Sequence, residues 1–317
     1  MSPGELLTAV PEVSVVMSVY NGASALPTTL QSVLDQQGCN FEFIVVNDGS
    51  ADASGAILDE CAAGDARLRV IHQTNTGLTR ALIRGCEAAH GEFIARQDCG
   101  DISLPGRLAA QVEVLRSQPD VAMVACGTRF VGPAGELLHD VTSKGEALQT
   151  GLARLNVRKI KGPPHHGGTM FRRTTYQAVG GYRQPFVVAQ DIDLWLRLSE
   201  QGKCLGQEQL GYEASVEAGS ISGRRRSEQF RLAELAIDCA LVRRKGQDEQ
   251  AVLESFAKAP FAPTKKGPVT SGERARFYYF VGSCLRGSNP PAARHYFRRA
   301  LGEQPLFLRA WLRSVLG

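Results

Sequence analysis

Runs of apolar residues alternate with amphipathic segments through the first 215 residues. Val13 to Tyr20 and Phe41 to Val46 are almost continuously apolar, as is typical of strands that are buried on both faces. Shorter strands are predicted at Leu68 to His72 and Glu92 to Gln97. Between and after them, apolar residues recur at helical spacing, which predicts helices carrying Leu26, Leu30, Val33 and Leu34, over Ala53 to Ala63, over Leu78 to Ala89, and from Pro105 through Leu115.

Strands that alternate with helices in this way predict an α/β fold, with a mostly parallel sheet and helices on both of its sides. In such sheets, ligands bind beyond the carboxyl ends of the strands. Three of the predicted strands end in polar groups, at Tyr20-Asn21, Asn47-Asp48 and Asp98 to Asp101. We therefore expect a ligand site where these ends meet.

The pattern changes near Ser227, after which strand signals disappear and helical spacing continues to the end of the chain. This predicts two units, residues 1–226 and a helical region at 227–317, with a loop over Pro260 to Gly272. Ala293, Phe297, Ala300 and Pro305 match the second half of a tetratricopeptide-like repeat, with Phe277 and Phe280 in its first helix. Two interpretations stay open, a helical appendage packed on the first unit and a peptide-binding array.

Composition excludes several classes of protein. Of 317 residues, 43% are hydrophobic and 21% charged, and the net charge is only +4, which argues against a nucleic-acid partner. No apolar run approaches the roughly 18 residues of a membrane helix, and the first residues do not resemble a signal peptide. Eight cysteines without a CxxC pair are typical of reduced thiols, so a cytoplasmic protein is expected.

Five motif strings occur in a fixed order: VSVVMSVYNG, FEFIVVNDGSADAS, GEFIARQDCGDISLPGRL, HHGGTMFRR and QDIDLWLRL. Together they resemble family 2 of the inverting glycosyltransferases, which have the GT-A fold, over roughly residues 11 to 220. The resemblance implies transfer of a sugar from a nucleoside-diphosphate sugar to a glycan, lipid-linked or protein acceptor, usually in surface polysaccharide or glycoconjugate synthesis.

The resemblance also implies residues that bind the nucleotide. Tyr20 would pack against the base, and Asp48 would accept a hydrogen bond from it; the alternatives are half-buried packing for Tyr20 and an Asx turn at Asp48. Arg80 lies near the family's basic residue, although a solvated helix arginine fits equally well. The full predicted set is Ser18, Tyr20, Asn21, Asp48, Arg80 and Asp98.

Members of the family commonly carry Asp-x-Asp-Asp where this chain reads Asp98-Cys99-Gly100-Asp101. The resemblance implies that Asp98 and Asp101 bind Mg²⁺ or Mn²⁺, which would offset charge on the leaving diphosphate. Gly100 replaces the carboxylate that usually faces the metal. We therefore expect a metal site with fewer protein ligands than usual. The metal would rely on Asp98, substrate phosphates and water, or a basic side chain would take its place.

The last motif carries the predicted catalytic base. Asp191 aligns with the family's base, and Gln190 stands where a glutamate is usual. The alternative interpretation is that Asp191 and Asp193 only favour the N-terminus of a helix. His166, Asp193 and Trp195 are predicted on the side of the acceptor or diphosphate. The glycines that follow His166 either admit substrate close to the backbone or only make a turn.

Two further expectations remain. Arg224, Arg225 and Arg226 could bind the diphosphate or anionic lipid headgroups, with peripheral attachment at the inner face of the membrane, or simply be solvated. A dinucleotide-binding dehydrogenase is excluded because the first strand-to-helix turn lacks G-x-G-x-x-G. A catalytically degenerate scaffold that uses the C-terminal helices to bind a partner stays open as the alternative function.

Overall fold

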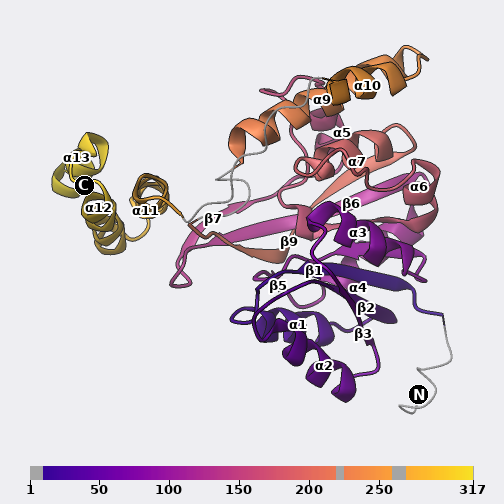
Figure 1. Cartoon of the computed structure of the whole chain (residues 1–317), viewed down its shortest axis with the longest axis horizontal. Coiled ribbons are helices and arrows are strands. Elements are labelled where there is room, and N and C mark those ends of the chain that lie inside the picture. Colours follow the sequence, from indigo (N-terminus) through magenta and orange to yellow (C-terminus); the bar gives the residue numbers. More distant parts are fainter. Residues whose placement is uncertain (1–9, 219–224, 259–268, 317) are drawn as a thin grey trace.

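The computed structural model describes residues 10–218, 225–258 and 269–316 (Figure 1). Strands and helices alternate in the first third of the chain: β1 (Val13–Val19), α1 (Leu26–Leu34), β2 (Phe41–Asp48), α2 (Ser54–Gly64), β3 (Leu68–Gln73), α3 (Leu78–Glu87), β4 (Phe93–Arg96), β5 (Ile102–Ser103) and α4 (Arg107–Ser117).

The middle of the chain is less regular and ends in the last strand: β6 (Val121–Val131), β7 (Leu137–Val141), α5 (Ala147–Leu152), the short 3₁₀ helix η1 (His166–Gly168), β8 (Thr169–Arg172), α6 (Arg173–Ala178), α7 (Gln190–Leu198) and β9 (Lys203–Ser215). Beyond β9 the described residues form helices only: α9 (Arg226–Arg244), α10 (Gln250–Lys258), α11 (Ser271–Leu285), α12 (Pro290–Glu303) and α13 (Leu308–Leu316).

The described strands form one nine-stranded sheet in the order β3-β2-β1-β4-β8-β6-β9-β5, with β7 beside β6. β3, β2, β1 and β4 are mutually parallel, which places their carboxyl ends on one edge, as predicted. β8 runs antiparallel to both β4 and β6, and β9 runs parallel to β6. The sheet is therefore parallel in its first half and mixed in its second.

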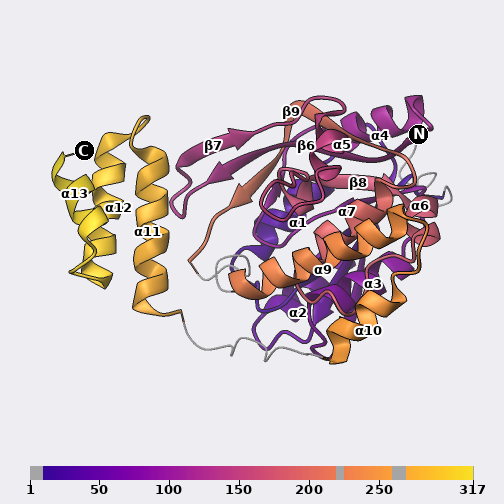
Figure 2. The ribbon, with the colours of Figure 1, turned by 90° about the horizontal axis from the view of Figure 1, so that it is seen from above.

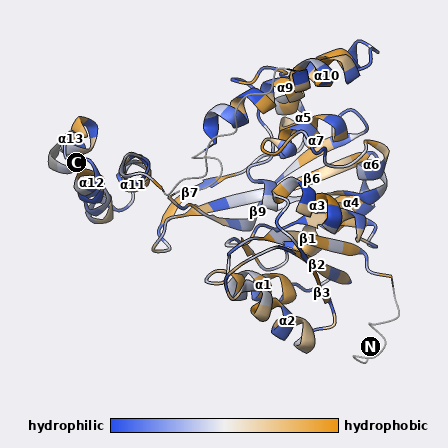
Figure 3. Cartoon of the chain, in the orientation of Figure 1, coloured by the Kyte–Doolittle hydropathy of each residue, from blue (hydrophilic) through white to orange (hydrophobic). Residues whose placement is uncertain are grey.

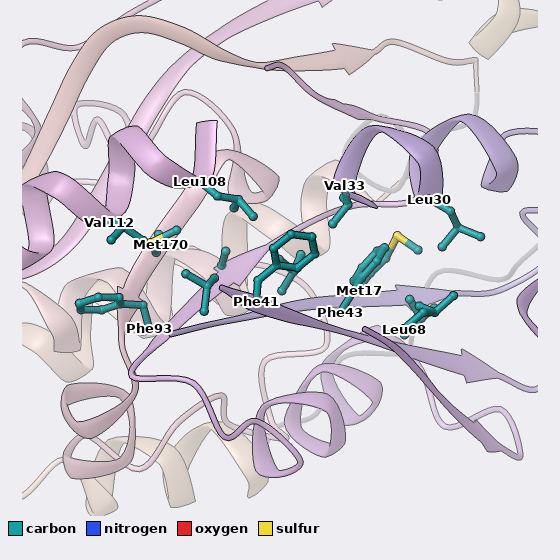
Figure 4. Close-up of a cluster of buried hydrophobic side chains, with 14 of the residues drawn as sticks. Met17, Leu30, Val33, Phe41, Phe43, Leu68, Phe93, Leu108, Val112 and Met170 are labelled. Carbon is teal, nitrogen blue, oxygen red and sulfur yellow. The ribbon is translucent and has the colours of Figure 1, made fainter. Parts of the chain in front are cut away.

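Alternate residues of the parallel strands enter two different cores, because successive side chains of a strand point to opposite faces. Val15, Met17 and Phe43 pack toward α1 and α4 in the cluster of Figure 4. Val16 and Ile44 pack on the opposite face, with Leu82 of α3. Both faces are thus covered, which explains why these strands read as unbroken apolar runs.

β2 extends two residues beyond the predicted strand end at Val46 and includes Asn47 and Asp48. Asp48 continues the parallel pairing with β3, opposite Gln73, and is 2% exposed. The carboxylate therefore belongs to the end of the strand, and not to the turn that we expected after it.

The C-terminal helices pack in two places. α9 shares a hydrophobic cluster with α7, through Leu232 and Leu196 among others. α11 and α12 form a second cluster that includes Leu138 of β7, and Tyr296 donates a hydrogen bond to Glu136 (2.6 Å). Figure 2 places α11–α13 at one end of the molecule, beside β7. The division at residue 226 stays a prediction.

The predicted repeat signature falls on α11, on α12 and on Pro305, which follows the C-cap of α12. Ala293, Phe297 and Ala300 are buried along one face of α12, whereas Phe280 of α11 is 44% exposed. Most of the predicted 260–272 loop lies outside the described residues, and α11 already begins at Ser271 with a capping box between Thr270 and Glu273. The tetratricopeptide interpretation also stays a prediction. Among the described helices, none is both long enough and apolar enough to span a bilayer.

Candidate active site

The loops that follow β1 and β2 are bonded to each other at the carboxyl edge of the sheet. The Asn21 amide nitrogen donates to Ser50 Oγ (2.9 Å), and the Ala51 amide donates to Asn21 Oδ1 (2.8 Å). Ser18 is half-buried two residues before Tyr20, and the Tyr20 side chain stays 51% exposed. Asn21 therefore ties the two loops together and leaves the Tyr20 ring available at the surface.

Asp48 accepts hydrogen bonds on both of its carboxylate oxygens. Its Oδ1 accepts from the Thr76 amide (2.8 Å) and Gln73 Nε2 (2.7 Å), and its Oδ2 accepts from the Gly77 amide (2.9 Å). The partners lie 25 to 29 residues away, so these bonds are not an Asx turn, and the predicted hydrogen bond from a base stays a prediction. In this structure Asp48 anchors the loop that leads into α3.

Arg80 lies in the first turn of α3, beyond the loop that Asp48 anchors. It is exposed, and its Nη2 is 3.4 Å from Gln184 Oε1. Next to it, the Thr79 hydroxyl donates to the Phe186 carbonyl (2.7 Å). The start of α3 is thus joined to the segment that leads to Asp191.

Asp98 follows β4, and its carboxylate forms an ion pair with the buried Arg96. Arg96 is fully buried, and its Nη2 is 2.7 Å from Asp98 Oδ1. Burial tends to raise the pKa of Asp98, but the charge of the Arg96 guanidinium brings that pKa below its usual value. Asp98 is therefore an anion across the physiological pH range.

Asp101 lies in the same loop with its carboxylate bonded on both oxygens. Oδ1 accepts from the Ser215 amide (3.0 Å) and Oδ2 from the Tyr212 hydroxyl (3.0 Å). Burial, together with the charge of Asp98, raises the pKa of Asp101 to about 8. Gly100 between them has a φ of +99°, a conformation that side-chain-bearing residues rarely adopt.

Asp98, Asp101 and His165 form a group that could hold a metal ion. His165 Nδ1 lies 3.9 Å from Asp98 Oδ2 and 3.7 Å from Asp101 Oδ2, and one ligand atom from each residue lies within 4.8 Å of the others. Two carboxylates and an imidazole suit Mn²⁺, and the oxygen donors also suit Mg²⁺. The donor set fits the expected cation and adds a histidine that the sequence analysis did not include.

Tyr212 of β9 positions all three members of this group. Its hydroxyl accepts from the Asp98 amide (3.0 Å) and donates to Asp101, and its ring stacks on His165 with centroids 5.2 Å apart. Gly167 makes room for that hydroxyl, because a Cβ there would collide with it. The tight glycine thus accommodates Tyr212, an explanation that neither sequence interpretation included.

The two histidines point to different places. His165 is extended and faces the carboxylates, whereas His166 begins η1 and lies with Nε2 2.6 Å from the Tyr182 hydroxyl. Burial lowers the pKa of His166 to about 3, with the Arg96 charge adding to the effect. His166 is therefore neutral and held by Tyr182, and His165 is the histidine closest to the predicted diphosphate position.

Asp191 lies in the first turn of α7, whose Leu194 and Leu198 are anchored in the core. The helix follows Ala189, which has a positive φ of 56°, and the Ile192 amide donates to Asp191 Oδ1 (2.9 Å). Burial raises the pKa of Asp191 to about 6; the Ile192 amide opposes this, and the nearby Asp98 charge adds to it. Asp191 is thus within electrostatic reach of Asp98.

Asp193 and Trp195 lie inside the protein. Asp193 is 1% exposed and pairs with Arg183 and Arg197 through both carboxylate oxygens. Trp195 is 5% exposed and packs in the core, with its ring centroid 6.0 Å from that of His166. Their placement on the acceptor side stays a prediction, because Asp193 is bonded to its two arginines whereas Trp195 Nε1 has no hydrogen-bond partner among the described residues. The ion pairs of Asp193 fix the position of α7.

The family model for glycosyl transferase family 2 matches residues 14–180, more than half of the chain. The chain belongs to this family. The matched region carries the loops after β1, β2 and β4 and both histidines, and it ends before α7.

Curated relatives agree with this assignment. The enzyme is 32% identical over 196 residues to EpsE of Bacillus subtilis, described as a glycosyltransferase, covering 61% of this chain and 68% of EpsE. It is 40% identical over 170 residues to EpsH of the same organism, and 25% identical over 197 residues to the hyaluronan synthase of Pasteurella multocida. These alignments cover 53% and 62% of this chain but only 49% and 20% of the two relatives.

Solved structures share the fold of this glycosyltransferase. Residues 1–349 of TarS from S. aureus, in complex with UDP-GlcNAc, superpose with a TM-score of 0.55 at 16% identity, covering 96% of this chain and 88% of that one. A mannosyltransferase from Pyrobaculum calidifontis, in complex with GDP-Man and Mn²⁺, gives 0.51 at 17% identity, with 98% and 80% covered. The fold is that of GT-A glycosyltransferases.

Several residues that support the site of this glycosyltransferase carry no recognisable sequence signal. Arg107 of α4 is 1% exposed and donates to the backbone carbonyls of Arg96 (2.7 Å) and Gly167 (2.6 Å), joining the two loops that hold the acidic group and His165. In the sequence, Arg107 and Tyr212 resemble ordinary helix and strand residues, because these partners lie 11 to 114 positions away.

Proposed function

We propose that this enzyme transfers a sugar, with inversion, from a nucleoside-diphosphate sugar to a hydroxyl group of a glycan, lipid-linked or protein acceptor. The observation that carries the proposal is the group of Asp98, Asp101 and His165, whose ligand atoms lie within 4.8 Å of one another, with Asp191 near enough for the Asp98 charge to add to its raised pKa. Solved relatives in complex with UDP-GlcNAc or GDP-Man support the donor class. The Eps proteins and hyaluronan synthase support a role in making polysaccharide or glycoconjugate.

Asp191 is the proposed general base. An inverting transfer needs one group to accept the proton of the acceptor hydroxyl while that oxygen attacks the anomeric carbon from the face opposite the diphosphate. A positioned base contributes about 10²- to 10⁴-fold, and it works best with a pKa near the operating pH. The pKa of Asp191, about 6, meets this condition better than an exposed aspartate would.

The proposed donor position lies between Tyr20 and the acidic group. The loop after β4 is joined to α1 by a hydrogen bond from the Gly100 amide to Thr29 Oγ1 (3.0 Å), and it approaches the loop after β1, where Cys99 Sγ lies 3.9 Å from the Gly22 carbonyl. A base stacked on Tyr20 would therefore have the Asp98 loop beside it. When bound, a divalent cation at Asp98, Asp101 and His165 would neutralise diphosphate charge.

Removing the metal is expected to stop turnover. Excess chelator should reduce donor hydrolysis to background and Mn²⁺ should restore it, because without the metal no cation at Asp98, Asp101 and His165 offsets the charge on the leaving diphosphate. His165→Ala should raise the Mn²⁺ concentration needed for half-maximal activity, whereas His90→Ala, at an exposed histidine elsewhere, should not. Full turnover in excess chelator would exclude the metal.

Removing the Tyr20 ring is expected to weaken nucleotide binding. Stacking of a base on an aromatic ring contributes about 1–3 kcal/mol, so Tyr20→Ala should raise the Kd for the nucleotide by roughly 5- to 150-fold. Tyr20→Phe keeps the ring and should bind nearly as the wild type does. The measurement is calorimetric titration with UDP and GDP. Equal affinity of the alanine variant would place the base elsewhere.

The donor itself is identified by a hydrolysis screen. The full chain is incubated with UDP-, GDP- and dTDP-sugars and Mn²⁺, and release of nucleoside diphosphate is measured. We expect turnover with one nucleotide class. Release from none of the donors, together with absence of binding by calorimetry, would contradict the proposal.

The second candidate is a catalytically degenerate scaffold. Gly100 and Gln190, which replace acidic residues common in the family, favour this candidate. Against it, the chain keeps the carboxyl groups of Asp98, Asp101 and Asp191, and His165 supplies a third ligand beside the first two. The same titrations separate the two, since a scaffold binds no donor or never turns it over.

The predicted membrane contact through three consecutive arginines stays a prediction. Arg224 lies outside the described residues, and Arg225, the residue before α9, pairs with Glu228 in the first turn of that helix. Arg225 is therefore less available for lipid headgroups, whereas Arg226 is exposed.

A further inference from the structure

The last helix, α13, has an apolar face with no partner among the described residues. Phe307 and Ala310 turn inward, and the Phe307 ring packs against Tyr279 of α11 with centroids 5.1 Å apart. Leu308, Trp311 and Leu312, at spacings of three and four, share another face and are 66%, 51% and 41% exposed. We call these three residues the α13 apolar face.

Arginines lie next to this face. Arg309 and Arg313 are one helical turn apart, exposed, and on the side of α13 that is neither buried nor apolar. Figure 3 shows hydrophobic and hydrophilic residues together on this helix, and Leu306 just before it is 97% exposed. An apolar stripe that contains Trp and Leu and is bordered by arginine is typical of helices that lie in a membrane interface.

The charge of residues 269–316, which include α13, also favours contact with a membrane interface. Residues 269–316 contain eight arginines, two glutamates and no lysine or aspartate, a net charge of +6, whereas the entire chain carries only +4. Arg274 pairs with Glu303, and Arg299 donates to the Tyr278 hydroxyl (2.7 Å). The other six arginines form no ion pair or hydrogen bond with another described residue: Arg276, Arg286, Arg294, Arg298, Arg309 and Arg313.

We propose that α13 binds the surface of an anionic lipid bilayer, with the α13 apolar face in the interface and the arginines against the headgroups. Charge complementarity selects this partner. A second copy of the chain would bring two units of +6 together, which opposes association. An anionic bilayer attracts such a unit, by roughly 1 kcal/mol for each arginine near the surface.

This contact would hold the enzyme in a defined orientation, because the unit is attached to the sheet. Tyr296 bonds to Glu136, and Leu138 of β7 packs in the same cluster as Phe297. β7 pairs with β6, which lies in the same sheet as the site. The proposal does not depend on the donor or acceptor of the transfer reaction.

The test is binding of the full chain to vesicles of phosphatidylcholine alone or with 30% phosphatidylglycerol, a composition that is our choice of probe. Co-sedimentation is expected only with the anionic vesicles. The chain has two tryptophans, and Trp195 is buried, so a blue shift of the emission reports Trp311. Arg309→Gln should weaken binding by about fivefold, since one arginine near the surface contributes roughly 1 kcal/mol.

A double change, Trp311→Ser with Leu312→Ser, is expected to weaken binding by about tenfold or more, because it removes most of the buried apolar area. Leu241→Ser, at a residue of α9 that is 40% exposed, is the matched control and should bind as the wild type does. Donor hydrolysis without vesicles should be unchanged in both variants, which shows that they fold. Equal binding to neutral vesicles, unchanged binding of the double variant, or a dimer that the double variant dissociates would overturn the proposal.

Discussion

Asp191→Asn is expected to abolish sugar transfer while nucleotide binding persists. Asparagine has nearly the same shape as aspartate but cannot accept the proton of an acceptor hydroxyl, so we expect transfer to fall by at least about 10²- to 10⁴-fold. The nucleotide is expected to contact Tyr20 and the Asp98 loop instead, so its affinity should change little. Transfer is measured with the donor found in the hydrolysis screen, and binding by calorimetry.

The pH profile gives an independent measurement of the same residue. The base acts only when ionised, and the pKa of Asp191 is about 6, so transfer should rise through pH 6 and level off above pH 7. The unfolding temperature of Asp191→Asn should not fall, because burial disfavours the charge that the change removes. Wild-type transfer by the variant, or a lower unfolding temperature with normal transfer, would assign Asp191 a structural role instead.

Asp193→Asn, two residues further along α7, is expected to destabilise the fold strongly. Its carboxylate is almost completely buried between Arg183 and Arg197, and the latter is 4% exposed. Arg183 keeps a second partner in Glu249 (2.9 Å), but Arg197 has no other carboxylate among the described residues. Removing one partner of a buried pair costs about 3–5 kcal/mol. The free energy of unfolding, from urea titration, measures this.

The matched control is Asp140→Asn. Asp140 pairs with Arg129 at 3.2 Å, but both side chains are more than a third exposed, so water replaces the lost interaction. We expect a much smaller loss of stability in this variant. Equal effects of the two changes would mean that the Asp193 network does not stabilise α7.

The fold of the first half was predictable because its information is local. Each parallel strand is buried on both faces, so its whole sequence is apolar, and each helix shows one apolar stripe. β6 to β9 were not identified one by one. β9, for example, contains Gln207, Glu208 and Gln209, and its parallel pairing with β6 passes through three register shifts. The sequence of such a strand has no clear two-residue hydrophobic period, so the strand is recognised only by its pairing with neighbouring strands.

The site shows the same contrast. Asp98, Asp101 and Asp191 were chosen from motif strings; the structure groups Asp98 and Asp101 with His165, and the charge of Asp98 acts on Asp191. His165 was overlooked in favour of His166, because the two are adjacent and identical in type; only the start of η1 turns one to the carboxylates and the other to Tyr182. Nothing in the sequence indicated that the loop at 73–77 would donate hydrogen bonds to both oxygens of Asp48.

The sequence by itself determined the alternation of strands and helices, the family, and which carboxylates were candidates for chemistry. These follow from residue type and spacing along the chain, where hydrophobic periodicity and motif order act over short distances. Tertiary structure decided which polar groups are free to bind a ligand and which already form hydrogen bonds or ion pairs within the protein. Burial, a fixed cation such as Arg96 and a shared hydroxyl such as Tyr212 act through space, and they set the partner and the pKa of each carboxylate.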